Sequence, residues 1–379
     1  IYKSLSVGPS DSFQTTKDNG YLLGSLDEEA LAVFQRPEFY VNERLYEKSA
    51  RLADLCFACS DYEYQLIHEH RPSLAKVTYL SGAPRFDLYK TPCVDIYTSK
   101  ADQYRKSYGR FILIPSNFGV REEMYKNQSL ENPDTPKQSQ DAQESEPPKR
   151  QQTRSRLNQA FEHYIAVIEK ISRNFPETPV IVRPHHGDDH NLWHEKLGDL
   201  ANVHVIYEGP VTAWLQAAQT MIHNGCTTAV EAACMGKASI CYAPVPESVS
   251  NHPSYKVSDM VYNENELFHL IQHHMDGDGA LGPDKQRYVQ ETLYPGENMH
   301  NFENIVEAIK QQPLPRSPIP WNRLRGHKLK QNIKAPFRPL KQRLSRNSSS
   351  RSSTSKFPSD KLDIEGMSRQ FAKQIDGHD

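Results

Sequence analysis

The second half of the chain alternates short apolar runs with amphipathic segments, and this alternation is the feature that most constrains its fold. Apolar runs of strand length occur at 179–184, 203–209, 220–224 and 238–244. The segments between them carry apolar residues at helical spacing. Strands that alternate with helices are typical of a parallel, doubly wound α/β sheet. We therefore predict such a sheet, and a buried-strand pattern at 111–115 extends it.

The first part of the chain shows a similar but less regular alternation over residues 26–110, which predicts a second sheet. A chain of 379 residues is long enough for two domains of ordinary size. We expect an N-terminal Rossmann-like domain at 1–105 and a C-terminal one at 106–312. Because the sequence lacks an initiator Met and begins as though in mid-domain, we expect the N-terminal domain to be truncated.

Two segments differ in composition from these domains. Residues 127–156 are polar and almost without apolar side chains, so they cannot bury enough surface to become ordered. We predict a disordered insertion there. The tail at 313–379 is a basic, low-complexity segment, with no Asp or Glu between Pro313 and Ser359. Solvated disorder and contact with an anionic membrane surface are both open for it. Nucleic acid is not expected as a partner, because the Arg/Ser-rich stretch of the tail lacks the interleaved aromatic residues of a base-stacking surface.

The overall composition is that of a soluble globular protein, with 24% charged and 37% hydrophobic residues. A net charge of −2 gives no general attraction to nucleic acid or membranes. The 6 Cys are scattered, which favours reduced thiols and a cytoplasmic location, with the tail as a peripheral membrane contact. Cys56 and Cys59 form a CxxC pair, for which a redox role is the alternative to simple burial.

Polar residues follow the predicted strands of the second domain. Arg183 and His185 end one strand, Glu208 ends the next, and His223 and Asn224 end a third. Ligands of open parallel sheets bind beyond the carboxyl ends of the strands. Helix N-termini there offer free N–H groups to a phosphate, and Arg183 and a histidine add charge-assisted hydrogen bonds. The pattern therefore predicts a diphosphate or phosphodiester site.

Structural roles are open for several of these residues. Thr228 and Glu231 have the spacing of a capping box at a helix start. His185 or His186 alone could be a hydrogen-bonded loop residue. Asp188 and Asp189 stand where the next helix begins, so we expect them to cap it.

A metal site is not predicted. His190 and His194 have the i, i+4 spacing of metal ligands on a helix. No third ligand follows at a diagnostic spacing, so neither histidine is assigned to a metal.

The first domain carries an acidic cluster, Asp27, Glu28 and Glu29, which we expect at the start of a helix. Acidic residues there interact favourably with the helix dipole. The alternative is catalytic: one of the carboxylates takes a proton from an acceptor hydroxyl across an interdomain cleft.

Several segments resemble bacterial surface-carbohydrate biosynthesis proteins, which look like glycosyltransferases of the two-Rossmann GT-B architecture. The resemblance spans roughly residues 20–310, without the insertion, and is carried by LDEEA, RLYEKSARLADLCFACSD, VTYLSGAPRFD, FILIPSNFG, VIVRPHHGD and HNGCTTAVEAACMGKASICYAP. It implies a GT-B-like α/β fold with two doubly wound, Rossmann-like domains that face an interdomain cleft.

The chain is also similar to GT-B sialyltransferases and related transferases of CMP-activated acidic sugars such as Kdo. This resemblance implies a base among Asp27, Glu28 and Glu29, with His185 on the phosphate of the leaving nucleotide. It also implies that Thr227 and Thr228 bind that phosphate and that Glu231 binds the ribose. The nucleotide-sugar site is assigned to Arg183, His186, Asn117, Asn224, Gly225, Thr227, Thr228 and Glu231. Three residues depart from the family pattern: Ala30 replaces Gly, and His186 and Ala238 replace Pro.

We therefore predict a glycosyltransferase of surface polysaccharide biosynthesis that uses a nucleotide-sugar donor, a carbohydrate acceptor and no metal or cofactor. A nucleotide-sugar 2-epimerase is the alternative enzyme, because it shares the two-Rossmann plan. A catalytically silent scaffold of a polysaccharide-synthesis complex is the alternative outside enzymes.

Overall fold

The computed structural model divides the chain into two compact units, with boundaries after Pro84 and after Glu291. Residues 85–291 form the second unit, and the described residues of 1–84 and 292–313 form the first. The structure describes residues 1–6, 10–27, 29, 31–118, 148–245, 251–295 and 300–313.

The first unit contains a sheet of 3 parallel strands in the order β1-β2-β3. Its strands are β1 (Gly24–Leu26), β2 (Leu55–Ala58) and β3 (Thr78–Leu80). Its helices are α1 (Ser10–Asp18), α2 (Ala32–Gln35), α3 (Pro37–Phe39), a π-helix (Tyr40–Arg44), α4 (Glu47–Ala50), α5 (Asp61–His70), a 3-10 turn (Ala75–Val77) and α15 (Asn301–Lys310). The predicted second parallel sheet is therefore confirmed.

Helix α15 packs on the first unit, whereas its residues fall within the range 106–312 that we expected to form the C-terminal domain. Ile305 and Ala308 lie one turn apart and pack against Leu55 and Phe57 of β2. Asn304 also donates to the carbonyl of Ser81, just after β3 (3.1 Å). The helix covers an apolar sheet face that sequence order alone could not assign to it.

The second unit contains a sheet of 6 parallel strands in the order β6-β5-β4-β7-β8-β9. Its strands are β4 (Ile112–Pro115), β5 (Val180–Arg183), β6 (Val203–Val205), β7 (Thr220–His223), β8 (Ile240–Tyr242) and β9 (Asp259–Val261). Its helices are α6 (Thr98–Tyr108), α8 (Pro148–Asn174), α9 (His190–Leu197), α10 (Val211–Ala217), α11 (Thr228–Cys234), α12 (Pro253–Lys256) and α13 (Glu264–Asp276). Two 3-10 helices, Pro84–Tyr89 and Cys93–Tyr97, precede these helices. A last helix, α14 (Pro283–Leu293), crosses the boundary after Glu291.

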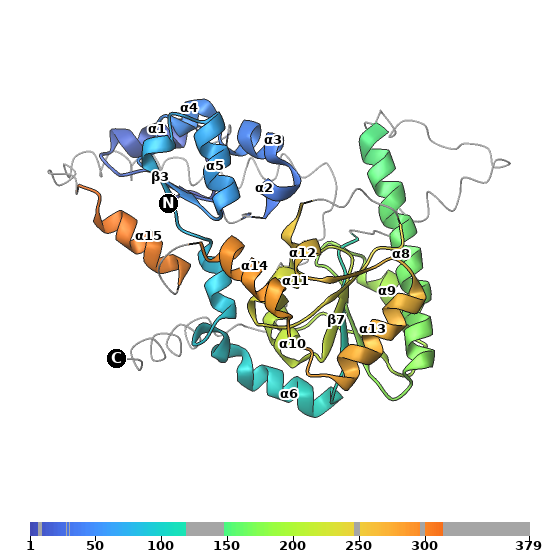
Figure 1. Cartoon of the computed structure of the whole chain (residues 1–379). Helices are drawn as coiled ribbons and strands as arrows, with labels where there is room; N and C mark the ends of the chain where they lie inside the picture. The colour runs from blue at the N-terminus through green and yellow to red at the C-terminus, as the bar shows by residue number, and fades with distance from the viewer. Residues whose placement is uncertain are drawn as a thin grey trace, which may run out of the picture. The chain divides into compact units, whose positions relative to one another are not determined.

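Helices cover both faces of this sheet (Figure 1). Ile112 and Ile114 of β4 join α8, α9 and α13 in one apolar core. On the other side, Trp214 of α10 stacks on Tyr104 of α6, with ring centroids 3.6 Å apart. Ile112 and Ile114 share one face because alternate residues of a strand point to the same side of the sheet. The predicted α/β class with a doubly wound parallel sheet is thus confirmed.

The predicted insertion at 127–156 lies outside the described residues as far as 147, and the predicted tail does so from 314 onward. The backbone of residues 148–156 belongs to α8 instead of the expected insertion. Lys, Arg and Gln, which dominate this stretch, have high helix propensity, so a polar composition did not prevent a helix. In the part of the chain that the structure describes, no helix has the length and apolar character needed to span a membrane.

Candidate functional site

The strand order of the second unit reverses once, between β4 and β7. The chain runs outward from β4 through β5 to β6, then returns to the other side of β4 and runs outward again through β8 to β9. This is the order of dinucleotide-binding Rossmann sheets, whose ligands lie at the carboxyl ends of the strands beside the reversal. The residues that follow β4, β5 and β7 therefore form the candidate site.

The loop after β5 is tied to the end of β4 by a buried carboxylate. Asp188 accepts from the hydroxyl of Ser116 and from the indole N–H of Trp193, the latter at 3.2 Å. The backbone N–H of His185 donates to Ser116 Oγ at 2.8 Å and to Asp188 Oδ2 at 3.2 Å. Asp188 Oδ1 is buried and has no hydrogen-bond partner among the described residues.

Asp188 is therefore not the helix cap that we predicted. The cap of α9 is Asp189, which accepts from the N–H of Asn191 at 3.0 Å. Asp188 turns inward because Ser116, Trp193 and the His185 amide supply its hydrogen bonds. Sequence reasoning missed this role, since Ser116 lies 72 positions earlier in the chain.

His185 is exposed at the tip of this loop, and His186 lies beside it with ring centroids 3.9 Å apart. The N–H of Gly187 donates to His185 Nδ1 at 3.1 Å. In its neutral form the imidazole therefore carries its proton on Nε2. Asn117, the second residue after β4, is also exposed.

Arg183 has a different environment from the one expected. Its guanidinium is buried and donates to the carbonyls of Glu208 and Gly209, both at 2.7 Å. It also lies over the ring of Tyr207, 5.0 Å from the centroid. Burial lowers the pKa of Arg183. These contacts make Arg183 an anchor for the loop after β6.

The loop after β7 is shaped by a buried histidine. His223 Nδ1 accepts from the N–H of Gly225 at 2.9 Å, and its Nε2 lies 2.8 Å from Ser258 Oγ. Burial lowers the pKa of His223 to about 3, so it is neutral near pH 7 and donates from Nε2. Gly225 has φ +91°, and a Cβ there would lie 2.5 Å from the hydroxyl of Tyr255. Asn224 Oδ1 is buried without a hydrogen-bond partner in the described part of the chain.

Helix α11 begins beside this loop. Thr227 is exposed, Thr228 is half-buried, and the Thr227 hydroxyl makes no capping hydrogen bond. The N–H groups of Thr228 and Ala229 interact instead with the sulfur of Cys226, whose thiol pKa is raised by burial to about 11.

Glu231 does not close the capping box that was one alternative for it. Its Oε1 accepts from Arg85 at 3.0 Å, and its Oε2 is buried without a partner among the described residues. Burial raises the pKa of Glu231, and the Arg85 guanidinium and a hydrogen bond with the Tyr89 hydroxyl partly oppose this. The Glu231 carboxylate thus pairs with Arg85, whereas in a capping box it would accept from a backbone N–H at the helix start.

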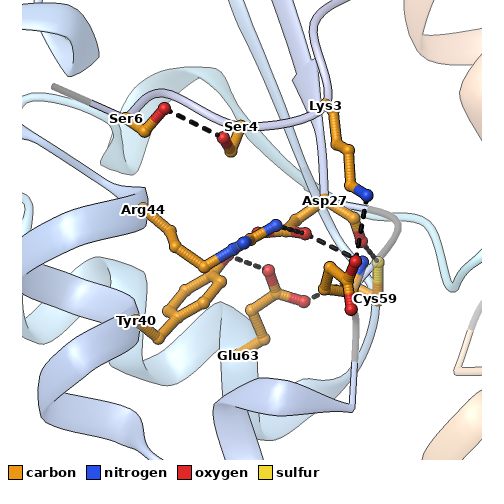
Figure 2. Close-up of polar contacts among 9 residues, drawn as sticks. Lys3, Ser4, Ser6, Asp27, Tyr40, Arg44, Cys59 and Glu63 are labelled. Carbon is orange, nitrogen blue, oxygen red and sulfur yellow. Dashed lines mark hydrogen bonds and ion pairs between the residues drawn. The ribbon is translucent and has the colours of Figure 1, made fainter. Parts of the chain in front are cut away.

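The acidic cluster of the first unit follows β1 directly instead of starting a helix, and helix α2 begins only at Ala32. Asp27 is buried and accepts from Arg44 through two hydrogen bonds of 2.5 and 2.6 Å (Figure 2). Glu29 is exposed and lies 2.9 Å from Lys3 Nζ. Glu28 lies outside the described residues. Asp27 is thus held in an ion pair, and Glu29 faces solvent.

A further buried carboxyl group, Glu63, lies close to this cluster (Figure 2). It accepts from the hydroxyl of Tyr40 and from the N–H of Cys59, the latter at 2.7 Å. Burial raises the pKa of Glu63 to about 7. Sequence reasoning missed it, although Ser60 and Glu63 have capping-box spacing and Ser60 Oγ does accept from the N–H of Glu63 (3.2 Å).

The CxxC pair does not have the properties of a redox site. Cys56 and Cys59 are both buried, and burial raises the pKa of the Cys56 thiol to about 12 and that of Cys59 well above its usual value. Reactive cysteines have lowered thiol pKa values. Among the described residues, no group of 3 or more His, Cys, Asp or Glu side chains is arranged to hold a metal ion.

No protein-family model matches this sequence, and no curated protein sequence does so either. Solved structures show a distant likeness. The UDP-GlcNAc 2-epimerase of Neisseria meningitidis bound to UDP-GlcNAc is 12% identical, with 80% of this chain and 73% of that chain covered and a TM-score of 0.49. The UDP-GlcNAc 2-epimerase of Methanocaldococcus jannaschii in complex with UDP-GlcNAc and UDP is 14% identical, covering 77% and 74%, with a TM-score of 0.45. HepE of Anabaena in complex with UDP and glucose is 12% identical, covering 80% and 81%, with a TM-score of 0.38. The chain is similar to these enzymes only in the broad plan of two parallel-sheet units.

Proposed function

We propose that this protein is a GT-B-like glycosyltransferase that uses a nucleotide-sugar donor in surface polysaccharide assembly. The observation that carries the proposal is the reversal of strand order between β4 and β7, because nucleotides bind at this position in doubly wound sheets. Two buried side-chain oxygens that follow β7, Asn224 Oδ1 and Glu231 Oε2, have no partner in the described part of the chain. Buried polar atoms are normally hydrogen-bonded, so unpartnered ones are expected where a ligand supplies the donors.

The proposal assigns the donor's parts to particular residues. A hydroxyl of the ribose donates to Glu231 Oε2, which carries the buried charge shared with Arg85. The phosphate of the leaving nucleotide accepts from His185 Nε2 and from the hydroxyls of Thr227 and Thr228. Arg183 acts through the loop that it anchors, and not by direct contact.

In the proposed reaction, the oxygen of an acceptor hydroxyl attacks the anomeric carbon of the donor sugar. The bond between that carbon and the phosphate oxygen breaks, and its electron pair leaves with the nucleotide. The hydroxyl proton passes to a carboxylate of the acidic cluster. Glu29, whose ion pair with Lys3 is exposed, suits this role better than Asp27, which is buried and accepts from Arg44 with both oxygens. A hydrogen bond from His185 stabilises the charge that develops on the phosphate.

The test is to incubate the full chain with labelled UDP-, CMP- and GDP-sugars, with and without oligosaccharide acceptors. We expect label in a saccharide product only when acceptor is present. Replacing His185 with alanine is expected to lower the rate about a hundredfold, since it removes a donor to the developing charge. His269→Ala, an exposed histidine of α13, is the matched control and should not change the rate.

Two outcomes would contradict the transferase. Epimerised sugar formed without any acceptor would assign the site to a 2-epimerase. No turnover of any donor, together with full cellular function of a chain in which Asp27, Glu28 and Glu29 are all alanine, would favour a silent scaffold.

A further inference from the structure

The first unit exposes a stacked pair of aromatic rings, Phe34 and Tyr62. Their ring centroids lie 5.2 Å apart and their planes differ by 22°. Phe34 is half-buried and packs against the apolar core of the unit, which fixes its ring in place. Tyr62 lies against it with 39% of its surface exposed. We call this pair the aromatic platform.

The platform lies at the carboxyl edge of the three-stranded sheet. Phe34 belongs to α2, which follows β1, and Tyr62 is the second residue of α5, which follows β2. β1 and β2 are parallel neighbours, with Leu26 opposite Phe57, so both connections leave from the carboxyl edge. The acidic cluster leaves from the same edge, and ligands of parallel sheets bind there.

From this geometry we propose that the platform binds one face of a pyranose ring of a saccharide, and that this saccharide is the acceptor of the proposed transfer. A pyranose chair has a face of C–H groups, which packs well on an aromatic ring with its negative face. Its equatorial hydroxyls point sideways, where the Tyr62 hydroxyl and charged groups of the unit can hydrogen-bond to them. The assignment as acceptor rests on the proposed function, whereas the stacking itself does not.

Exposed carboxylates at the same edge of the sheet favour a saccharide over a nucleic acid. Asp61 precedes Tyr62 in the first turn of α5 and is exposed, and Glu29 is exposed in the loop after β1. Carboxylates are poor neighbours for a phosphate backbone, which is bound mainly by Lys and Arg. They are good acceptors for sugar hydroxyls.

The experiment is saturation-transfer difference NMR on the full chain, with methyl glycosides of glucose, galactose, mannose and N-acetylglucosamine as probes. We expect saturation of the protons on one face of at least one of these rings. Tyr62→Ala should lower that signal about fivefold, and Tyr62→Phe should largely retain it, because the ring makes the contact. Tyr21→Ala is the matched control: Tyr21 is 48% exposed but precedes β1, at the opposite edge of the sheet.

The platform proposal is overturned if the wild-type chain transfers saturation to none of the glycosides. It is also overturned if the Tyr62→Ala chain transfers saturation as strongly as wild type. Stronger saturation of adenosine than of any glycoside, lost in Tyr62→Ala, would also overturn it in favour of a nucleobase site. CMP, CDP, UDP and GDP in parallel samples separate the two proposals. Glycoside binding without nucleotide binding keeps the platform and removes the transferase, and the reverse result keeps the transferase and removes the platform.

Discussion

Replacing Arg44 with methionine is expected to lower the free energy of unfolding of the first unit by about 3–5 kcal/mol. Asp27 is only 4% exposed, and both of its carboxylate oxygens accept from the Arg44 guanidinium. Methionine keeps much of the side-chain volume but leaves a buried carboxylate without its counter-ion. The loss can be measured by urea unfolding, with hydrogen exchange of peptides from β1 and β2 reporting on the first unit.

Two further variants make this measurement specific. Arg51→Met removes an ion pair at the surface, in which the side chain of Arg51 is 71% exposed and that of Glu47 is 42% exposed. This variant should lower the free energy of unfolding by less than about 1 kcal/mol. In the Asp27→Asn, Arg44→Met double variant no unpaired charge is buried at position 27, so part of the lost stability should return. If Arg44→Met cost no more than Arg51→Met, Asp27 would not be held in place by Arg44, and it would again be the first candidate for the base.

The second large effect concerns Glu63 and pH. A carboxyl group whose pKa is raised on folding binds more protons in the folded state, so its contribution to stability is full below the unfolded pKa and is lost as pH rises through the folded pKa. For Glu63 these values are 4.5 and about 7. Between pH 4.5 and 7 the contribution of Glu63 to the free energy of unfolding therefore falls by about 3 kcal/mol.

Glu63→Gln is consequently expected to gain stability relative to wild type as pH rises, by about 3 kcal/mol between pH 4.5 and pH 8. The difference between the two chains isolates Glu63 from the buried histidines of the second unit, because those titrate equally in both. Glu69→Gln, an exposed residue of the same helix α5, is the control and should show no such trend. A difference between Glu63→Gln and wild type that stays constant with pH would mean that Glu63 is ionised throughout the range.

The alternation of strands and helices was predictable because it depends on local patterns. The apolar run at 179–184 became β5 (Val180–Arg183), and the strand at 220–224 became β7 (Thr220–His223). Those patterns also indicated that polar residues would collect at the carboxyl ends of the strands, and the structure places His185 and Asn224 there.

The partners of the polar groups were not predictable, because each pair is formed by the tertiary fold. Glu231 is paired with Arg85, 146 positions earlier, and Asp188 with Ser116. The local spacing predicted that Glu231 and Asp188 would cap helices. Both carboxylates are instead buried beside partners that come from distant parts of the sequence. The same holds for α15, whose apolar stripe suits any sheet face of the right shape.

The central claim, a nucleotide site in the second unit, is tested most directly by isothermal titration calorimetry of the full chain with CMP, CDP, UDP and GDP. At least one of these nucleotides should bind. Glu231→Gln should weaken it about tenfold, because it removes a charged acceptor for the ribose. Glu195→Gln, an exposed residue of α9, should bind as the wild type does. If none of the nucleotides binds the wild-type chain, or if Glu231→Gln binds as tightly as wild type, the site is not where the strand order places it.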